Sequence, residues 1–452
     1  MEKNLENSPE YSDIGMEKAE EGMIYVPPPD KSITIRAVLL AAFAEGKTKI
    51  INPLFCDDTE AALDCISELG AEVFVRNGNI EINGGNLHNP AVPLCCRSSG
   101  TLARLLCGLM AGSGLEAEID GSAQLRGRPF RRIIEPLKLM GADITAAEAG
   151  RLPVKIKPAA LHGIKYFMPA ASAQVKSALL FAGIFAEGKT EITEPFLSRT
   201  HGENMLEMFS VPVERKGLSA AVAGSSFSAR MIAAPDILHE SPLKACRIKV
   251  PGDFSSAAPF IAGAQLLKLP MRVQKTGLNP SRTGLINVMK QAGAYFRRYG
   301  ACRAEQCGTL DFYPAPQLMP AEVMAEEVPS LIDELPLLAV LFAAGGSRAL
   351  FHGTDELKVK ESDRLAAVIE LIRKSGAAAE HKNGVLSVSG PFDKKAEFVY
   401  DAAEDHRMAM SAAVASLACP MIKIKGAGCV NKSYPEFFCD FQSVFGILPE
   451  IA

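Results

Sequence analysis

Six apolar runs are spaced along the chain, and each predicts a helix that is buried on every side. They open near Lys31, Ser99, Ser172, Ser255, Asp333 and Asp405, at intervals of 68 to 83 residues. Each run is rich in Ala and Leu, as in AVLLAAFA and SALLFAGIFA. A helix that is apolar nearly all round must lie inside a core, because no face of it suits water.

A second, more amphipathic helix follows each run and ends at a turn between the helix and a short strand. The turn residues are Gly70, Gly141, Gly293, Gly376 and Gly446, with Val211 in the glycine position of the third copy. Glycine just past the last helical residue, followed by a strand such as residues 71–75, is the expected end of a helix. The sequence FAEGKT also occurs twice, from Phe43 and from Phe185, which supports an internal repeat.

Together the two markers predict six units of roughly 75 residues, each with two helices and several strands. We expect three units in each of two α/β domains, because three buried helices can share one core surrounded by sheets. The break falls near residues 251–253. Ser255 and Ser256 are interpreted as caps of the fourth buried helix.

Composition and charge exclude several classes of protein. The 452 residues are 48% hydrophobic and 22% charged, which is typical of a folded chain of more than one domain. Residues 1–21 carry seven acidic groups and two lysines, so we expect an acidic, disordered tail. The net charge is -4 and the tail holds -5, which leaves +1 on the remaining chain. A balance this close to neutral gives no long-range field for nucleic acid.

The sequence contains neither a secretory signal nor an apolar run of about 18 residues that could cross a membrane. We therefore expect a cytoplasmic protein. The cysteines number eleven and lack paired C-x-x-C spacing. This pattern indicates free thiols rather than a zinc site or a disulfide framework.

The first turns of the predicted buried helices hold groups that bind anions. Lys31, Arg36, Arg104 and Arg407 lie within about one turn of a predicted helix start. A cation there opposes the positive end of the helix dipole, whereas a bound phosphate or carboxylate is stabilised by it. Further cationic groups occur in four polar segments, at residues 121–129, 198–201, 358–364 and 431–435. Together they predict a site for several anionic groups.

Eight segments form a specific series in the chain. In order they read DKSITIRAVLLAAFAEG, SSGTLARLL, LRGRPF, SAQVKSALLFAG, LIDELPLLAV, LKVKESDRLAAV, DHRMAMSAAVA and NKSYPEFF. The combination of IDELP, KESDR and DHR is more specific than any one piece. The series resembles the 5-enolpyruvylshikimate-3-phosphate synthase family of enolpyruvyl transferases, over about residues 23–446.

The resemblance implies a two-domain inverse α/β barrel of six βαβαββ-like repeats, three per domain, with the active site in the cleft between the domains. The first domain would span residues 30–249, and the second would combine residues 22–29 with 250–452. The family transfers the enolpyruvyl group of phosphoenolpyruvate to the 5-hydroxyl of shikimate 3-phosphate. The reaction releases phosphate by addition and elimination through a tetrahedral intermediate, in the pathway to the aromatic amino acids.

The resemblance implies no metal and no organic cofactor. We expect a monomer whose partners are these two small molecules, with no nucleic acid and no membrane. Both substrates carry a phosphate and a carboxylate, so the site must neutralise several negative charges, and arginine suits such groups through bidentate hydrogen bonds.

By position in the family's motifs, three sets of residues are implied. The catalytic set is Lys31, Asp333, Glu361 and Lys432. The phosphoenolpyruvate set is Lys31, Gly100, Arg104, Arg128, Gln174, Arg364, Arg407 and Lys432. The shikimate 3-phosphate set is Lys31, Ser32, Arg36, Ser172, Ala173, Gln174, Ser198, Asp333 and Lys360. Asp333 is the candidate base and Glu361 the candidate acid, and the sequence leaves this choice open. A carboxyl group that donates a proton at neutral pH needs a raised pKa.

Some positions depart from the family pattern, and alternatives to its reaction stay open. The departures are Pro29 for Gly, Ser98 for Asn, Ala173 for the second Ser of some members and Glu356 for the Asn of some members. Gly100 stands where some glyphosate-tolerant members have Ala, so we expect a glyphosate-sensitive enzyme. The alternative functions are an enolpyruvyl transferase for UDP-N-acetylglucosamine and a non-catalytic paralogue that keeps the anion-binding cleft.

Overall fold

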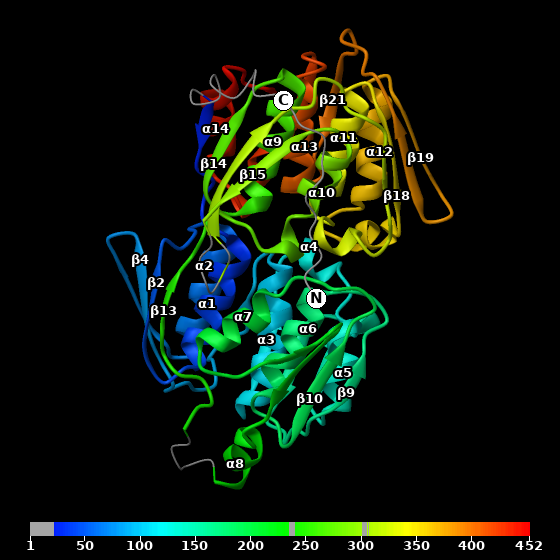
Figure 1. Cartoon of the computed structure of the whole chain (residues 1–452). Helices are drawn as coiled ribbons and strands as arrows, with labels where there is room; N and C mark the ends of the chain where they lie inside the picture. The colour runs from blue at the N-terminus through cyan, green and yellow to red at the C-terminus, as the bar shows by residue number, and fades with distance from the viewer. Residues whose placement is uncertain (1–21, 235–239, 301–304, 306) are drawn as a thin grey trace, which may run out of the picture.

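The protein, seen in a computed structural model that describes residues 22–234, 240–300, 305 and 307–452, has two halves, one above the other in Figure 1. The predicted acidic tail, residues 1–21, lies outside the described residues. Each half has its own hydrophobic core. The core of the first half gathers residues from Ile33 to Val250, and that of the second gathers Tyr25 with residues from Phe254 to Phe441. Within the described residues, no helix combines the length and the apolar character needed to cross a membrane.

The predicted apolar runs form buried helices at the centre of the two cores. In the first half these are α1 (Lys31–Phe43), α3 (Gly100–Ser113) and α6 (Ala173–Gly183). In the second half they are α9 (Phe254–Leu267), α11 (Leu335–Ala344) and α13 (His406–Ser416). Helix α3 packs against α1 and α6, while α9, α11 and α13 pack against one another. Each triplet is thus enclosed on all sides, as its apolar sequence requires.

The amphipathic helices cover these triplets and end at turns with positive φ. They are α2 (Asp57–Glu68), α5 (Arg131–Leu139), α7 (His201–Met208), α10 (Gly284–Gln291), α12 (Arg364–Lys374) and α14 (Phe437–Phe445). Gly70 after α2 has φ 98°, a left-handed conformation that glycine adopts without strain. After α7 the positive φ falls on Ser210, at 68°. The assignment of Val211 to the glycine position is therefore wrong by one residue.

Shorter helical segments connect these elements. They are α4 (Ala123–Arg126), α8 (Phe227–Ala233), η3 (Glu148–Gly150), η4 (Pro280–Arg282), η5 (Val328–Ser330), η6 (Thr354–Val359) and η7 (Ala427–Lys432).

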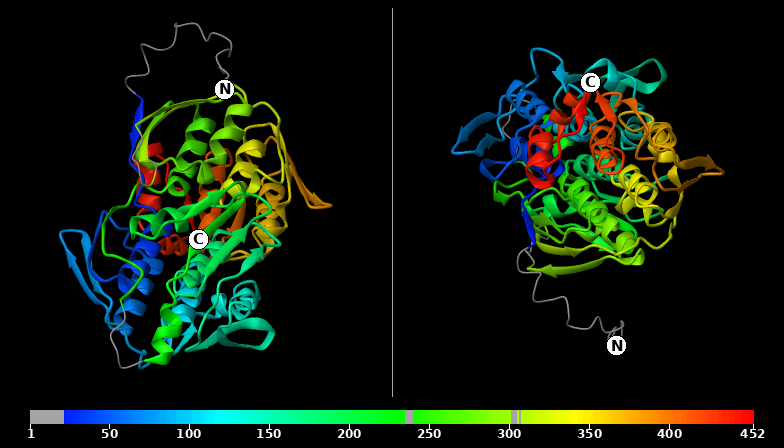
Figure 2. Two further views of the ribbon diagram at one scale, coloured as in Figure 1. Left: turned by 60° about the horizontal axis from the view of Figure 1, so that its bottom comes forward. Right: turned by 90° about the horizontal axis from the view of Figure 1, so that it is seen from above.

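Within the described residues the strands form six sheets, three in each half. Five of them are four-stranded and share one pattern, a parallel pair followed by two antiparallel pairings. The sixth, β21-β22-β23, is parallel throughout. Seen from above, helices of the upper half stand at the centre while strand pairs lie at the rim (Figure 2). Six units counted from the sequence spacing agree with six sheets.

The strands of the first half form the sheets β13-β2-β4-β3, β5-β6-β8-β7 and β9-β10-β12-β11. Their bounds are β2 (Gly46–Ile51), β3 (Glu72–Arg76), β4 (Asn79–Gly84), β5 (Leu94–Cys95), β6 (Ala117–Asp120), β7 (Asp143–Ala147), β8 (Arg151–Lys157), β9 (Lys165–Phe167), β10 (Lys189–Thr193), β11 (Glu214–Lys216), β12 (Ser219–Ala223) and β13 (Arg247–Lys249).

The strands of the second half form β1-β14-β16-β15, β17-β18-β20-β19 and β21-β22-β23. Their bounds are β1 (Met23–Tyr25), β14 (Met271–Gly277), β15 (Tyr295–Tyr299), β16 (Cys307–Tyr313), β17 (Ala321–Val323), β18 (Arg348–His352), β19 (Ala378–Lys382), β20 (Val385–Ser389), β21 (Phe398–Asp401), β22 (Ile422–Lys425) and β23 (Glu450–Ile451). Strand β1 pairs with β14 although α1 and β2 follow it in the chain, so the chain passes between the halves twice.

Side chains cap five of the buried helices. The capping residues are Asp30, Ser99, Ser172, Asp253 and Asp405. The interpretation of Ser255 and Ser256 as caps of α9 is wrong, because both lie inside the helix and the backbone N–H of Ser255 donates to Asp253 Oδ1 at 2.8 Å. The Ser255 hydroxyl donates instead to Glu334, the residue before α11.

Candidate active site

A cavity of about 330 Å³ lies between the two halves, where all six buried helices begin. Its lining includes Lys31, Ser32, Thr101, Arg104, Ala173 and Gln174 from the first half, and Asp253, Asp333, His406 and Arg407 from the second. Helix N-termini carry free N–H groups and partial positive charge, so six of them directed at one space favour an anion there. The volume is in the range of small-molecule sites.

Cationic side chains outnumber carboxylates around this cavity. Among the described residues, eight cations line it: Lys31, Arg104, Arg128, Arg132, Arg199, Lys360, Arg364 and Arg407. Four carboxylates line it: Asp253, Asp333, Glu356 and Glu361. The excess of positive charge suits ligands with several negative groups.

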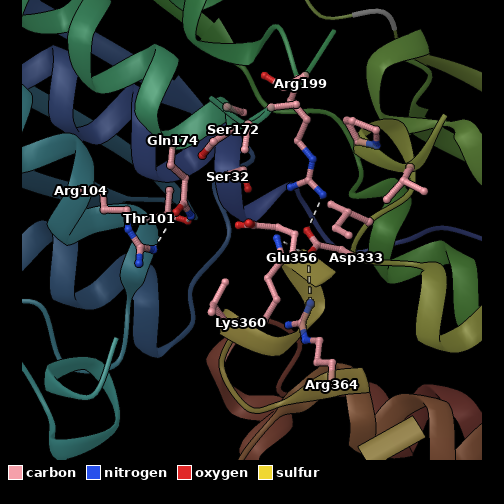
Figure 3. A pocket seen from close by; sticks show the side chains of 18 of the residues that line it. Ser32, Thr101, Arg104, Ser172, Gln174, Arg199, Asp333, Glu356, Lys360 and Arg364 are labelled. Atoms are coloured by element: carbon pink, nitrogen blue, oxygen red, sulfur yellow. Dashed lines mark hydrogen bonds and ion pairs between the residues drawn. The ribbon is translucent and has the colours of Figure 1, made fainter. Parts of the chain in front are cut away.

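Asp333 lies between cations from both halves (Figure 3). Arg199 of the first half donates to its Oδ2. Arg364 Nη1 donates to its Oδ1 at 3.0 Å, and Lys360 Nζ lies 3.9 Å from the same oxygen. Burial raises the pKa of Asp333, but Arg199, Lys360 and Arg364 together outweigh burial and hold that pKa well below its usual range.

Arg364 is fully buried and joins Asp333 to two further carboxylates. Its Nε donates to Asp405 Oδ2 at 2.8 Å, and its Nη2 donates to Glu361 Oε2. Glu361 Oε1 lies 3.4 Å from Arg128 Nη1, which comes from the first half. Burial raises the pKa of Glu361, but Arg364 and Arg128 hold it well below its usual range. In this arrangement Glu361 is ionised at neutral pH, not protonated as a general acid requires.

The two candidate lysines are held differently. Lys31 Nζ donates to Asp58 Oδ2 at 2.9 Å. Burial lowers the pKa of Lys31, but Asp58 outweighs burial, so the pKa is raised and the group is an ammonium ion. Lys432 does not line the cavity. Its Nζ donates to Gln124 Oε1 at 2.7 Å, and Gln124 Nε2 donates to the backbone carbonyl of Glu361 at 3.2 Å, which links Lys432 to the candidate acid.

Arg104 and Arg128 come together at the start of α3. Arg104 Nη1 donates to Gln174 Oε1 at 2.7 Å, and burial with the neighbouring Arg128 lowers the pKa of Arg104 to about 9. The guanidinium of Arg104 lies over the Phe130 ring, 5.0 Å from its centroid. A Cβ at Gly100 would lie 2.4 Å from Arg128 Nη1 and 2.9 Å from Arg104 Nη1. Glycine therefore leaves room for both guanidinium groups.

The other predicted residues form the wall at α1 and α6. Ser32, Ser172, Ala173, Gln174 and Ser198 all line the cavity. Within the described residues the Ser198 hydroxyl is buried without a hydrogen-bond partner, which is unusual unless a ligand meets it. Arg36 lies behind this wall, where its Nη1 donates to the Ser32 carbonyl at 3.1 Å. The structure thus brings the predicted residues to one cavity, with Arg36, Gly100 and Lys432 outside its lining.

A comparison with known families assigns the chain that forms this cavity to a family. The model of EPSP synthase (3-phosphoshikimate 1-carboxyvinyltransferase) matches residues 17–441. The chain belongs to the EPSP synthase family. It is an enzyme that carries out the family's enolpyruvyl transfer in the shikimate pathway, with the family's two-domain inverse α/β barrel fold. This assignment decides against the alternative transferase for UDP-N-acetylglucosamine.

Individual relatives agree with the family. The chain is 39% identical over 428 residues to a 3-phosphoshikimate 1-carboxyvinyltransferase of Carboxydothermus hydrogenoformans, covering 93% of this chain and 96% of the relative. It is 37% identical over 431 residues to that of Geobacillus kaustophilus, covering 94% and 97%. An EPSP synthase structure from Acinetobacter baumannii superposes with a TM-score of 0.76 at 31% identity, covering 93% and 95%.

The departures from the EPSP synthase pattern have local partners in this chain. The hydroxyl of Ser98 lies 2.8 Å from that of Ser122. Glu356 accepts a hydrogen bond from Arg132 Nη1 at 2.6 Å, so the pair joins the two halves. Ala173 is the first residue of α6, directly after the cap Ser172. These contacts give the polar groups of Ser98 and Glu356 hydrogen-bond partners within the protein.

Sequence reasoning left several residues of this EPSP synthase site unassigned, and four of them are informative. Thr101, Arg132 and Arg199 line the cavity, and Asp58 pairs with Lys31. Arg199 stands next to Ser198 in a polar segment, which was a usable signal. Arg132 and Asp58 sit on amphipathic helices among other charged residues, and only the packing of α5 and α2 shows which charges face the cavity.

Proposed function

We propose that shikimate 3-phosphate and phosphoenolpyruvate bind together in this cavity. The proposal rests on one observation, that in the part of the chain that the structure describes six helix N-termini and eight cationic side chains from both halves converge on a single space. Each substrate has a phosphate and a carboxylate, so the pair brings charge that this cavity compensates.

Shikimate 3-phosphate occupies the wall at α1 and α6. The hydroxyls of Ser172 and Ser198 and the N-terminus of α6 receive its phosphate, and Arg36 reinforces this wall from behind Ser32. Ala173 contributes its backbone N–H and Gln174 its amide. Lys31, Asp333 and Lys360 face the hydroxyl groups of the ring. The unpartnered buried hydroxyl of Ser198 supports this placement.

Phosphoenolpyruvate occupies the side lined by arginines. The groups that receive its phosphate and carboxylate are Lys31, Arg104, Arg128, Gln174, Arg364 and Arg407, with Gly100 leaving the space. Lys432, which lies outside the lining, is linked to this side through Gln124 and Glu361. The close approach of Arg104 and Arg128, and the pKa of Arg104 lowered to about 9 by burial and by Arg128, support this placement, because an anion would relieve the repulsion.

Two carboxylates move the protons. In the first step Asp333 takes the proton of the 5-hydroxyl of shikimate 3-phosphate while the hydroxyl oxygen adds to C2 of phosphoenolpyruvate. Glu361 gives a proton to the methylene carbon of phosphoenolpyruvate. In the second step Glu361 takes back a proton from the new methyl group while phosphate leaves C2 with the proton held by Asp333. Phosphoenolpyruvate at Arg128 and Arg364 would raise the pKa of Glu361, because its charge offsets theirs. Lys31 and Lys432 stabilise the charge that develops.

Phosphate release with both substrates present tests this function. We expect phosphate only when phosphoenolpyruvate and shikimate 3-phosphate are supplied together. Each substrate alone, and UDP-N-acetylglucosamine in place of shikimate 3-phosphate, should give none. Tight binding of shikimate 3-phosphate without turnover would support the non-catalytic paralogue instead.

The domain limits are part of the same proposal. Residues 30–249 form one domain and residues 22–29 with 250–452 form the other, which the two separate cores support. The enzyme acts as a monomer in the cytoplasm, and light scattering at assay concentration would measure its mass.

Replacing Gly100 by alanine is expected to weaken phosphoenolpyruvate binding. The added methyl group would displace the guanidinium of Arg128 or Arg104. Overpacking costs about 1–3 kcal/mol, so KM for phosphoenolpyruvate should rise by about tenfold, and competitive inhibition by glyphosate should weaken as well. Gly428→Ala is the control, because a Cβ there meets nothing within 4 Å. Unchanged kinetics in Gly100→Ala would show that these arginines do not hold phosphoenolpyruvate.

A further inference from the structure

The chain crosses between the halves at two neighbouring segments. Residues 26–30 lead from β1 to α1, and residues 250–253 lead from β13, which runs upward beside β2 in Figure 1, to α9. The N–H of Asp30 donates to the Pro251 carbonyl at 2.8 Å, and the N–H of Asp253 donates to the Pro28 carbonyl at 2.7 Å. A Cβ at Gly252 would lie 2.7 Å from Pro27 Cγ, so the two segments are in close contact.

One arginine binds both of these crossover segments. Arg282, at the end of η4, is 3% exposed. Its Nη2 donates to Asp253 Oδ1 at 2.9 Å and lies 3.8 Å from Asp30 Oδ2. Asp30 and Asp253 are the N-caps of α1 and α9, because each carboxylate also accepts a backbone N–H of its helix at 2.8 Å. A single guanidinium therefore holds the cap of the first helix of each half.

The contacts of Arg282 lead to both walls of the cavity without lining it. On one wall, Asp30 directly precedes Lys31 and Ser32, which line the cavity. On the other, Arg282 Nη2 donates to the Ser255 hydroxyl at 2.5 Å, and the Ser255 carbonyl accepts from Arg407 Nη1 at 3.1 Å. The Ser255 hydroxyl in turn donates to Glu334, the neighbour of Asp333.

We propose that Arg282 is a positioning residue for enolpyruvyl transfer. By holding the two crossover segments together, it sets Lys31 and Ser32 of the first half against Asp333 and Arg407 of the second. The inference rests on the function proposed above for those four residues. Burial lowers the pKa of Arg282, but Asp253 and Asp30 outweigh burial and raise it, so the guanidinium is charged in this arrangement.

Two substitutions and a matched control test this role. Arg282→Met removes the charge and keeps the length, while Arg282→Lys keeps the charge. Val388→Ala is the control for lost stability alone, because Val388 is a buried core residue of β20, which pairs with β18 and β19. All three are assayed at a temperature where circular dichroism shows them folded.

In Arg282→Met we expect kcat to fall by about 10- to 100-fold with a raised KM for both substrates, because small displacements of binding groups cost this much. Arg282→Lys should recover part of the loss. Val388→Ala should lower Tm and leave kcat and KM unchanged. Wild-type kinetics in folded Arg282→Met, or equal losses in Val388→Ala, would overturn the proposal. If Arg282→Met does not fold, wild-type kinetics in Arg282→Lys would overturn it equally.

A readout without turnover separates this inference from the function itself. Hydrogen exchange at the N–H groups of Asp30 and Asp253 reports the contact between the crossover segments. We expect faster exchange at both groups in Arg282→Met than in Val388→Ala. If exchange were faster in Arg282→Met but the wild-type protein released no phosphate, Arg282 would still hold the crossover segments together, and the proposed function would be rejected. Unchanged exchange in Arg282→Met would reject the positioning role of Arg282, whatever the activity of the variant.

Discussion

Replacing Glu361 by glutamine is expected to lower kcat by about 10²- to 10⁴-fold, which is the usual contribution of a positioned proton donor or acceptor. Glutamine keeps the size of the side chain and an oxygen that accepts from Arg364, but it cannot pass a proton at neutral pH. Glu361 contacts Arg128 and Arg364, which lie on the proposed phosphoenolpyruvate side and not at the wall proposed for shikimate 3-phosphate. The change should therefore leave shikimate 3-phosphate binding, measured by calorimetry, close to that of the wild type.

Glu356→Gln is the matched control for this experiment. Glu356 is a carboxylate that lines the same cavity and pairs with Arg132 at 2.6 Å, so its loss changes the charge of the site equally. We expect it to alter KM more than kcat, because it moves no proton. Wild-type kcat in Glu361→Gln, or an equal loss in Glu356→Gln, would remove Glu361 from the chemistry.

Much of the fold could be predicted because the chain repeats a simple signal. A helix such as α11, with the sequence LPLLAVLFAA, has no polar face and can only be buried. The start of such a helix can also be predicted from the sequence, since Asp30 and Ser172 are residue types that cap helix N-termini well. Where two adjacent residues could serve, the sequence could not choose. Asp253 and Ser255 compete for the start of α9, and only the bond from the Ser255 N–H to Asp253 decides between them.

The site was predictable as a set of charges but not as a network. Lys31, Arg128 and Arg364 are cations in polar segments, and their sequence shows that anions are bound. The i, i+3 spacing of Glu361 and Arg364 indicates that this pair lies on one face. The sequence does not show that Arg364 also joins Asp333 and Asp405, because these two carboxylates come from separate segments that meet only after folding. For the same reason the expected raised pKa of Glu361 does not follow from its sequence context. Arg364 and then Arg128 lower that pKa, and Arg128 belongs to the other half of the protein.

Replacing Arg364 by methionine is expected to lower the free energy of unfolding by about 3–5 kcal/mol, the usual cost of removing one partner from a buried ion pair. The side chain of Arg364 is 1% exposed and that of its partner Asp405 is 0% exposed. Methionine leaves Asp405 without its cationic partner and removes one of the cations that contact Asp333. Urea unfolding measures the loss, and Arg215→Met is the control, because its ion pair with Glu207 lies on the surface and should matter little.

The pH dependence shows whether the loss is one of charge. Asp333 and Glu361 have folded pKa values below the unfolded values of about 3.9 and 4.3, so their ion pairs stabilise the wild type fully above about pH 5. That stability disappears as the pH falls through the folded pKa values, because the protonated carboxyl groups no longer need the guanidinium. The difference between wild type and Arg364→Met should therefore be largest near pH 7 and shrink below about pH 4. A difference that stayed constant from pH 7 to pH 3 would mean that Arg364 stabilises the protein by packing alone.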